Sequence, residues 1–399
     1  MSYLGLKRSY TIKEIFKDQD NWSWYQVKDP DIPAYKIKEV EKMLACKDPE
    51  KSGFFRYACP SHPEQTIIVP KTCKSSVCSS CGTLAGDKWV ERAMTLFPDT
   101  TFRHVTFTVP AELRTVFRSR PKTFVQLLHK ACSGVVVDWA KEHGFLPAIT
   151  TGLHTFGRDL KIHPHIHMLV STGGIDLKTS KDWKDYDYLP ERMLKSRFKA
   201  VLLGMLRQEG LIDSSLSDKL YRYEWYVRLG CEHAPLETTV SYIGRYIKRP
   251  PLSSKHILGY SRDSSRVMFE YQDHRDGKAW KTMVVSVETF IGLILQHILP
   301  PHTRRINHYG LMHSKVRGKY QDVLERLSKR NRKHRRQALR QQVGSSWRER
   351  QKDYHGKDPL VCRVCGQEMV LVEMGRYSKK EGKVVVVPVQ EKYQQTMGV

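Results

Sequence analysis

Histidines alternate along the segment His163-Pro164-His165-Ile166-His167. Alternate side chains of a β-strand share one face, so we expect these imidazoles to point the same way. A further histidine, His154, precedes the turn-like segment Gly157-Arg158-Asp159. If the two segments form a hairpin that folds near Asp159 and Leu160, His154 lies opposite His165 and three ring nitrogens converge. The pattern His-x(10)-His-x-His therefore predicts a metal site made of His154, His165 and His167.

The competing interpretation of these histidines is a polar edge strand that binds nothing. For a His-x-His pair beside a proline this interpretation is the simpler one. The third histidine, matched in position across the hairpin, favours a metal instead. Three imidazole ligands suit zinc, manganese, iron or nickel better than magnesium on ligand softness alone.

The cysteines form a second pattern. Cys59-Pro60-Ser61-His62 and Cys78-Ser79-Ser80-Cys81 are two pairs with two residues inside each pair, and fifteen residues separate the pairs. This layout is typical of a tetrahedral structural zinc site held by two knuckles. Cys46 and Cys73 lie nearby as alternative or additional ligands, which leaves a second ion open. The sequence does not divide these six residues between sites.

The remaining cysteines have other predicted roles. Cys362-Arg363-Val364-Cys365-Gly366 is a single knuckle, half of a zinc ribbon, and it needs partners from elsewhere in the chain. Cys132 lies in an apolar helical pattern and Cys231 ends a strand-like run, so both are predicted to be buried small hydrophobic residues. The sequence shows no secretory signal core, which argues against disulfides.

The charge of the chain indicates a polyanionic partner. Its formal net charge is +25 and its pI is about 9.6. The excess is concentrated between Arg326 and Arg350, where Glu349 is the only acidic residue. Such a segment binds a phosphate backbone in a salt-dependent way, although a solvated helix face or a disordered basic arm has the same composition.

At 399 residues the chain is expected to form two or three domains. Its first residues lack an apolar signal core, and its longest apolar stretch, from Phe290 to Leu299, is interrupted by Gln296 and His297. We therefore expect no membrane partner and a cytoplasmic location.

Periodicity predicts the elements that must position the histidines. Two strands carry them, a turn follows at Gly173-Gly174, and the neighbouring elements complete a β-α-β-β-α-β order, the ferredoxin-like arrangement. The predicted helices cover residues 34–44, 84–96, 121–142 and 190–208, and the predicted flanking strands cover residues 102–109 and 224–231. This α+β interpretation divides the chain into an N-terminal helical and zinc-binding domain (1–98), a nuclease domain (99–290) and a basic C-terminal region (291–399).

A further predicted helix, residues 236–248, contains Tyr242 and Tyr246. Tyrosines four residues apart share one helical face, and such a pair is most often half-buried packing. Beside a metal site on a basic protein, a tyrosine hydroxyl becomes a nucleophile for a phosphodiester, and the product is a covalent phosphotyrosine. Two tyrosines on one face allow two successive strand exchanges.

Three segments together carry a family resemblance. They are His163–His167, the run Tyr242-Ile243-Gly244-Arg245-Tyr246-Ile247-Lys248-Arg249-Pro250, and residues 297–310. These segments resemble the HUH transposases of rolling-circle insertion sequences, specifically the IS91-like group with two tyrosines. The cysteine-rich part from Cys46 to Cys81 is similar to the N-terminal zinc domain of that group, so the resemblance extends over most of the chain.

The resemblance implies roles for individual residues. His165 and His167 form the metal pair of the HUH motif, His154 is the third ligand with Asp159 as the alternative, and Tyr242 and Tyr246 are the nucleophiles. It also implies Mg²⁺ or Mn²⁺ as the working ion, structural Zn²⁺, and cleavage of single-stranded DNA at transposon ends through a 5′-phosphotyrosine. His62 departs from the cysteine that is usual in the group. Because they flank the tyrosines, Arg245, Lys248 and Arg249 are predicted to contact DNA phosphates.

Other functions use some of the same residues. A plasmid rolling-circle replication initiator or a conjugative relaxase has the same chemistry, and the zinc module favours a transposase over both. A hydrolase with a metal-bound water requires the histidines but tolerates loss of both tyrosines. A noncatalytic zinc-finger DNA-binding protein tolerates loss of all of them. The oligomeric state and the recognised DNA sequence are not encoded in these patterns.

Overall fold

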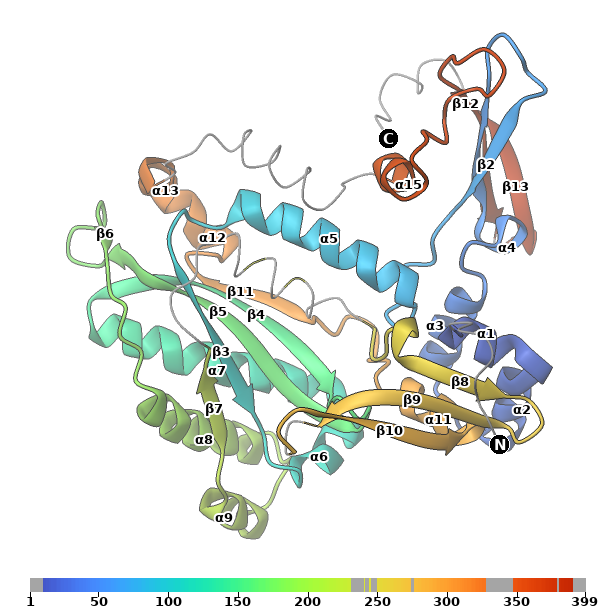
Figure 1. Ribbon diagram of the computed structural model, residues 1–399. Coiled ribbons are helices and arrows are strands. Elements are labelled where there is room, and N and C mark those ends of the chain that lie inside the picture. The colour runs from blue at the N-terminus through green and yellow to red at the C-terminus, as the bar shows by residue number, and fades with distance from the viewer. Residues whose placement is uncertain are drawn as a thin grey trace.

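The computed structural model describes residues 10–230, 240, 244, 250–273, 276–327, 347–378 and 380–389, which form a mixture of helices and strands (Figure 1). Several predicted residues lie outside this part of the chain. They are Tyr242, Tyr246, Arg245, Lys248, Arg249 and Cys231. Most of the basic run, residues 328–346, also lies outside it.

The largest sheet holds the histidine strands. Its strand order is β11-β4-β5-β3-β7, with every neighbouring pair antiparallel and with β6 added beside β5. Along the chain, β3, α7, β4, β5, α8 and β7 occur in the predicted β-α-β-β-α-β order, with α6, β6 and α9 inserted between them. The elements of this unit are β3 (Phe102–Thr108), α6 (Leu113–Ser119), α7 (Pro121–Glu142), β4 (Phe145–Phe156), β5 (Ile162–Asp176), β6 (Trp183–Lys184), α8 (Glu191–Gln208), α9 (Ser214–Arg222), β7 (Tyr226–Leu229) and β11 (Ile306–Gly310).

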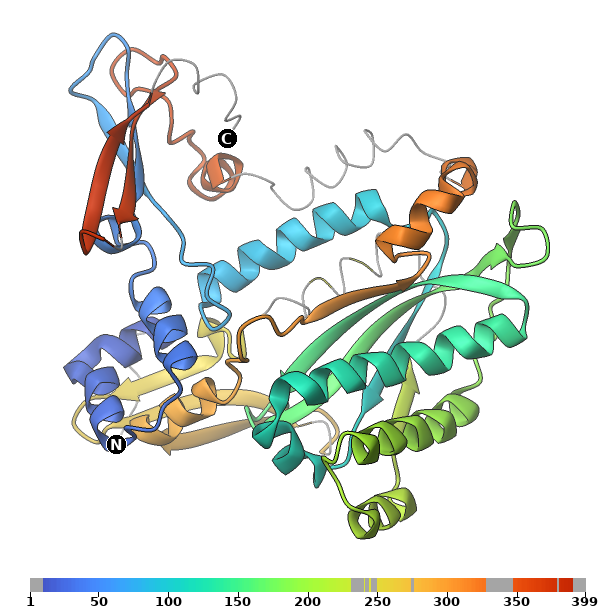
Figure 2. The same cartoon turned by 180° about the vertical axis from the view of Figure 1, so that it is seen from behind.

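One face of this sheet packs against α7 and α8, which lie side by side across it (Figure 2). Alternation along each strand creates that face, since Val105 and Phe107 of β3 and Ile166 and Met168 of β5 are fully buried beneath the helices. Pro121 starts α7 at its first turn, and α7 has the predicted bounds. Its Cys132 is buried and free, as predicted. The core of this unit therefore lies between the sheet and these two helices.

The opposite face of the sheet packs against α5 (Ser79–Leu96). Val90 and Met94 of α5 form a hydrophobic cluster with Leu169 of β5, and the helical residue Val240 belongs to the same cluster. Leu169 has the same parity along β5 as His165 and His167. The histidines therefore face α5 and Val240, not α7 and α8.

The predicted turn at Gly173-Gly174 is wrong, because both glycines lie inside β5. Gly173 has φ of +99°, and a Cβ added to Gly174 would lie 2.0 Å from the carbonyl oxygen of Leu146. The register between β4 and β5 shifts nearby, between Pro147 and Ile149. The glycines allow β5 to pass close to β4 at this irregularity, where any side chain would clash.

A second sheet, β10-β9-β8, packs with the N-terminal helices and α11. Its core contains the buried side chains of Ile12, Phe16, Phe269 and Phe290. Its elements are α1 (Ile12–Lys17), η1 (Asp18–Asp20), α2 (Asn21–Lys28), α3 (Ala34–Leu44), η2 (Ser254–His256), β8 (Ile257–Ser261), β9 (Arg266–Asp273), β10 (Ala279–Ser286) and α11 (Val287–Leu295).

The third sheet, β13-β12-β1-β2, joins strands from both ends of the chain. Figure 1 shows it at one end of the molecule, away from the histidine strands. Its elements are α4 (Pro49–Ser52), β1 (Phe54–Ala58), β2 (Thr66–Pro70), α15 (Trp347–His355), β12 (Val370–Ser378) and β13 (Lys383–Pro388). After β11 the chain continues into α12 (Ser314–Arg317), η3 (Gly318–Tyr320) and α13 (Gln321–Leu327), whose Val323 joins the cluster of α5 and Leu169. Within the described part of the chain, no helix combines the length and apolar character needed to cross a membrane.

His129 on α7 gives a prediction about acid stability. Its Nδ1 lies 2.8 Å from the Thr151 hydroxyl, and burial lowers its pKa from 6.5 to about 4. Between these values the unfolded chain binds a proton more readily than the folded chain, so the stabilising contribution is complete above pH 6.5 and is lost as the pH falls towards 4. Replacing His129 by glutamine should remove about 3 kcal/mol of this pH dependence from the free energy of unfolding.

Urea unfolding of the wild type and His129→Gln at several pH values between 7 and 4 measures this effect. The exposed His313 supplies a control, because His313→Gln should keep the wild-type dependence of the free energy of unfolding on pH. The prediction would be contradicted if the free energy of unfolding of His129→Gln changed with pH in parallel with that of the wild type.

Candidate metal centre

The β4–β5 hairpin brings three imidazoles together. His154 pairs with His165 across the two strands, as the sequence predicts, and Gly152 pairs with His167. The ring centroid of His154 lies 5.2 Å from that of His165 and 4.4 Å from that of His167. Each residue offers a ring nitrogen, and these nitrogens lie within 4.8 Å of one another. The three predicted ligands can therefore reach one ion.

The turn of the hairpin is fixed from two directions. The Gly157 amide donates to the Lys161 carbonyl at 2.9 Å, and Leu160 adopts a φ of +62° with its side chain buried. The Leu160 carbonyl accepts from Gln296 Nε2 at 2.7 Å and from His297 Nε2 at 2.9 Å. These two residues immediately follow α11, so this part of the chain anchors the turn that holds the histidines in register.

Asp159, the alternative third ligand, lies in the turn and is not part of the histidine group. Its Oδ1 accepts from the Lys161 amide at 3.3 Å, and its Oδ2 forms an ion pair with the Lys161 ammonium at 3.2 Å. The structure thus brings His154, not Asp159, to the other two histidines. The carboxylate instead stabilises the turn.

Neighbouring groups orient two of the rings. Nδ1 of His165 donates to the His163 carbonyl oxygen at 2.7 Å, which leaves Nε2 directed at Nε2 of His167, 3.1 Å away. Nδ1 of His167 lies 2.8 Å from Nε2 of His104, and these two rings stack with centroids 5.0 Å apart. In metal sites the second ring nitrogen is held in this way, which fixes the tautomer of the ligand.

Burial keeps these imidazoles neutral. It lowers the pKa values of His165 and His104 to about 4 and that of His167 well below 6.5, and neighbouring imidazoles lower the two ligand values further. A neutral imidazole presents a lone pair at pH 7, which a metal ligand requires. The site therefore fits a cation at neutral pH without first losing protons.

His104 was not among the metal-site residues that the sequence predicts. It lies on β3, where Thr106 pairs with His167, and strand alternation turns His104 to the same face of the sheet. A lone histidine in a strand gives no metal signal by spacing. The available signal was its parity with Thr106 and Thr108, which became informative only when β3 was placed beside β5.

The cysteines form two clusters. Cys46, Cys73, Cys78 and Cys81 make one, with sulfur–sulfur distances of 3.6 Å for Cys46–Cys81, 3.4 Å for Cys73–Cys81 and 3.7 Å for Cys46–Cys78. A tetrahedral site with zinc–sulfur bonds of about 2.3 Å has edges of roughly 3.8 Å. The four sulfurs thus fit a zinc ion.

The predicted pairing of the two N-terminal knuckles in one site is wrong. Cys59 and His62 lie beside Cys362 and Cys365, and not beside Cys78 and Cys81. The cause is the β1–β2 hairpin, which carries the first knuckle onto β12, while the second knuckle begins α5. Cys46 and Cys73, predicted as alternative or additional ligands, complete the cluster of the second knuckle.

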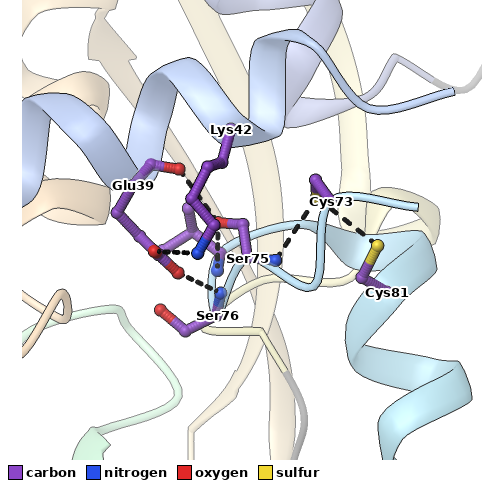
Figure 3. A network of polar contacts seen from close by, with 7 residues as sticks. Glu39, Lys42, Cys73, Ser75, Ser76 and Cys81 are labelled. Carbon is purple, nitrogen blue, oxygen red and sulfur yellow. Dashed lines mark hydrogen bonds and ion pairs between the residues drawn. The ribbon is translucent and has the colours of Figure 1, made fainter. Parts of the chain in front are cut away.

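A polar network holds the loop of the four-cysteine cluster (Figure 3). Glu39 on α3 accepts from the Ser76 amide at 2.7 Å and pairs with Lys42 at 2.7 Å. The Ser75 hydroxyl donates to the Glu39 carbonyl oxygen, and the Ser75 amide donates to the Cys73 sulfur at 3.3 Å. Burial opposes ionisation of Glu39, but these donors outweigh it and leave its pKa below 4.5. Glu39 therefore positions Cys73 through the loop.

Comparisons with known proteins identify relatives of this chain. A family model described as a putative transposase matches residues 148–321, and one described as a transposase zinc-binding domain matches residues 17–109. The transposase for insertion sequence element IS801 of Pseudomonas savastanoi pv. phaseolicola is 27% identical over 79% of this chain and 80% of its own length. The putative transposase y4qJ of Sinorhizobium fredii (strain NBRC 101917 / NGR234) is 26% identical over 77% of this chain and 82% of its own length. No solved structure matches the chain.

These matches define a transposase with an N-terminal zinc-binding module. The chain belongs to the IS91-like transposases. Its function is in DNA transposition, and its N-terminal module binds structural zinc.

The contact between His104 and His167 yields a prediction about metal affinity. His104→Ala should weaken Mn²⁺ binding about 10- to 100-fold, because the ring of His167 loses the group that orients it. Loss of a ligand in His165→Ala should abolish binding at this site. Isothermal titration with Mn²⁺ measures both, with His313→Ala as a surface control. Unchanged affinity in His104→Ala would show that His104 does not orient the ligand.

Gly244 yields a prediction about the segment that carries the tyrosines. A Cβ added there would lie 2.0 Å from Val90 Cγ2 and 3.3 Å from Trp89 Cε3 on α5. Valine cannot easily rotate away, so Gly244→Ala should lower the free energy of unfolding by about 1–3 kcal/mol. Gly204→Ala on α8 is the matched control, because nothing lies within 4 Å of its added Cβ and alanine favours a helix. Equal unfolding midpoints for the two variants would contradict this contact.

Proposed function

We propose that this transposase is an HUH endonuclease and strand transferase that nicks and rejoins single-stranded DNA at transposon ends. The β-α-β-β-α-β unit is its ferredoxin-like nuclease domain. The observation that carries the proposal is the convergence of His154, His165 and His167 on one face of the β4–β5 hairpin. Family membership and the charge of +25 support a nucleic-acid substrate.

In this proposal His154, His165 and His167 hold the catalytic cation, which family resemblance gives as Mg²⁺ or Mn²⁺. When bound, the cation polarises a phosphodiester oxygen and offsets developing negative charge. The chain contributes neutral ring nitrogens, fixed by the His163 carbonyl and His104. These contacts place the ligands before DNA arrives, so little reorganisation accompanies binding.

Tyr242 and Tyr246 are the proposed nucleophiles. The tyrosine oxygen forms a bond to phosphorus while the bond to the 3′ oxygen breaks, the phenolic proton is transferred to the leaving oxygen or to water, and a 5′-phosphotyrosine results. Support comes from Val240, which shares a hydrophobic cluster with Leu169. Leu169 lies two residues beyond His167 and on the same face of β5, so Val240, two residues before Tyr242 in the sequence, packs on the side of the sheet that holds the histidines.

Rejoining reverses the same step. A free 3′ hydroxyl attacks the phosphotyrosine, the tyrosine leaves, and the phosphodiester forms again without an external energy source. Two tyrosines allow one to hold a cut strand while the other attacks the next. Arg245, Lys248 and Arg249 flank the tyrosines in sequence and are the proposed contacts to DNA phosphates.

A DNA substrate also implies that the protein acts at the bacterial nucleoid, in the cytoplasm.

Covalent capture tests this mechanism. Labelled single-stranded oligonucleotides from the transposon ends are incubated with protein in Mn²⁺ or EDTA and resolved on denaturing gels. We expect a Mn²⁺-dependent protein–DNA adduct that persists at reduced yield in Tyr242→Phe or Tyr246→Phe and disappears in the double variant. Tyr377→Phe, on the exposed part of β12, is the control and should form the adduct at the wild-type level.

The other outcomes identify other functions. Cleavage without an adduct in the wild type would indicate hydrolysis by a metal-bound water. Binding without cleavage would indicate a noncatalytic zinc-finger DNA-binding protein. Adduct formation on a plasmid origin, with none on the transposon ends, would indicate a replication initiator or relaxase.

A further inference from the structure

The second cysteine cluster lies partly outside the matched zinc-binding domain, which ends at residue 109. Cys59 and His62 follow β1, whereas Cys362 and Cys365 precede β12. Cys59 Sγ lies 3.5 Å from Cys365 Sγ and 3.8 Å from His62 Nδ1, and all four ligand atoms lie within 4.8 Å of one another. These separations approach the roughly 3.8 Å edge of a tetrahedral zinc–thiolate site.

Each half of the cluster is a tight backbone turn. In the first, the Cys59 amide donates to the Gln65 carbonyl at 3.1 Å and the Gln65 amide donates to the His62 carbonyl at 2.9 Å. In the second, the Cys362 amide donates to the Gln367 carbonyl at 2.8 Å and the Gly366 amide donates to the Cys362 carbonyl at 3.0 Å. Two such turns, each supplying two ligands, make up a zinc ribbon.

Two features of the second turn orient its cysteines for metal binding. Gly366 has φ of +73°, a conformation that glycine adopts without strain, and it lets the chain reverse directly after Cys365. The Val364 and Cys365 amides donate to the Cys362 sulfur, the arrangement of a zinc knuckle. The two turns also contact each other, because the Ser61 hydroxyl donates to Gln367 Oε1 at 2.6 Å.

The surrounding sheet has a small core. Tyr57 of β1 pairs with Leu371 of β12, and the buried cluster beneath them contains two of the four ligands. Its members are Tyr57, Cys59, Leu360, Cys362, Met369 and Leu371. So few apolar side chains provide little hydrophobic stabilisation for strands that are about three hundred residues apart in the chain. A metal ion shared by both turns would supply the missing constraint.

We infer that Cys59, His62, Cys362 and Cys365 bind a second structural Zn²⁺ ion, which clasps the C-terminal strands β12 and β13 onto the N-terminal zinc module. The histidine that replaces the usual cysteine thus belongs to a Cys₃His site, separate from the Cys₄ site of Cys46, Cys73, Cys78 and Cys81. The clasp makes the C-terminal knuckle part of the N-terminal module. This inference does not depend on the proposed DNA-cleavage mechanism.

Zinc stoichiometry tests the site. The full chain is purified with reductant and measured by native mass spectrometry and elemental analysis, in a His165→Ala/His167→Ala background so that the catalytic site contributes no zinc. We expect two Zn²⁺ per chain, one after Cys362→Ser/Cys365→Ser, one after Cys46→Ser/Cys81→Ser, and two in the control Cys132→Ser. One zinc in the parent chain, or two in Cys362→Ser/Cys365→Ser, would overturn the inference, as would a Cys59–Cys365 disulfide with no metal.

A conservative variant separates ligand loss from misfolding. His62→Cys should retain two zinc ions, and after cobalt substitution its sulfur-to-cobalt charge-transfer band should grow because a thiolate replaces an imidazole. An unchanged cobalt spectrum would show that His62 is not a ligand.

Hydrogen–deuterium exchange tests the clasp itself. In Cys362→Ser/Cys365→Ser, amides of β12 and β1 should exchange at least about tenfold faster, while those of β4 and β5 keep the parent rates. Parent-like protection in β12 would overturn the clasp even if the zinc were lost.

Discussion

The antiparallel pairing of β4 with β5 is the constraint on which the histidine site depends. Side chains alternate between the two faces of a strand, so a slip of one residue would move His165 and His167 into the core under α7 and α8. It would also remove Ile166 and Met168, which are fully buried, from that core and turn them towards the polar histidine face, at a cost of up to about 2 kcal/mol each. Packing of the apolar face therefore sets the register of the ligands.

Burial of the imidazoles connects stability with chemistry. Each neutral ring is kept from protonation by its surroundings, and neighbouring imidazoles would repel a second charge. In the proposed function, a cation in this position would add to an already basic protein, and the phosphodiester of DNA would offset that charge. The same low pKa values that free the lone pairs for a metal make the fold sensitive to acid.

Both the histidine site and the second cysteine cluster depend on segments that are far apart in the sequence. β11, from the predicted C-terminal region, pairs with β4, and the residues after α11 fix the histidine turn. β12 pairs with β1, so the last strands belong to a sheet begun by the first ones. α11 packs with the N-terminal helices. The N-terminal module, the histidine sheet and the C-terminal strands are consequently coupled through packing and strand pairing.

Local sequence determined much of this protein. Residues 34–44 and 121–142 form the helices that their periodicity predicts, and the spacing of His154, His165 and His167 gave the hairpin register, because short-range alternation encodes both. Tertiary structure alone brought His104 to His167 and divided the six N-terminal ligands between two clusters. It also placed Gly173 and Gly174 inside a strand. Each of these depends on which strands become neighbours, and strand pairing is set by packing of residues far apart in the chain, which local spacing does not encode.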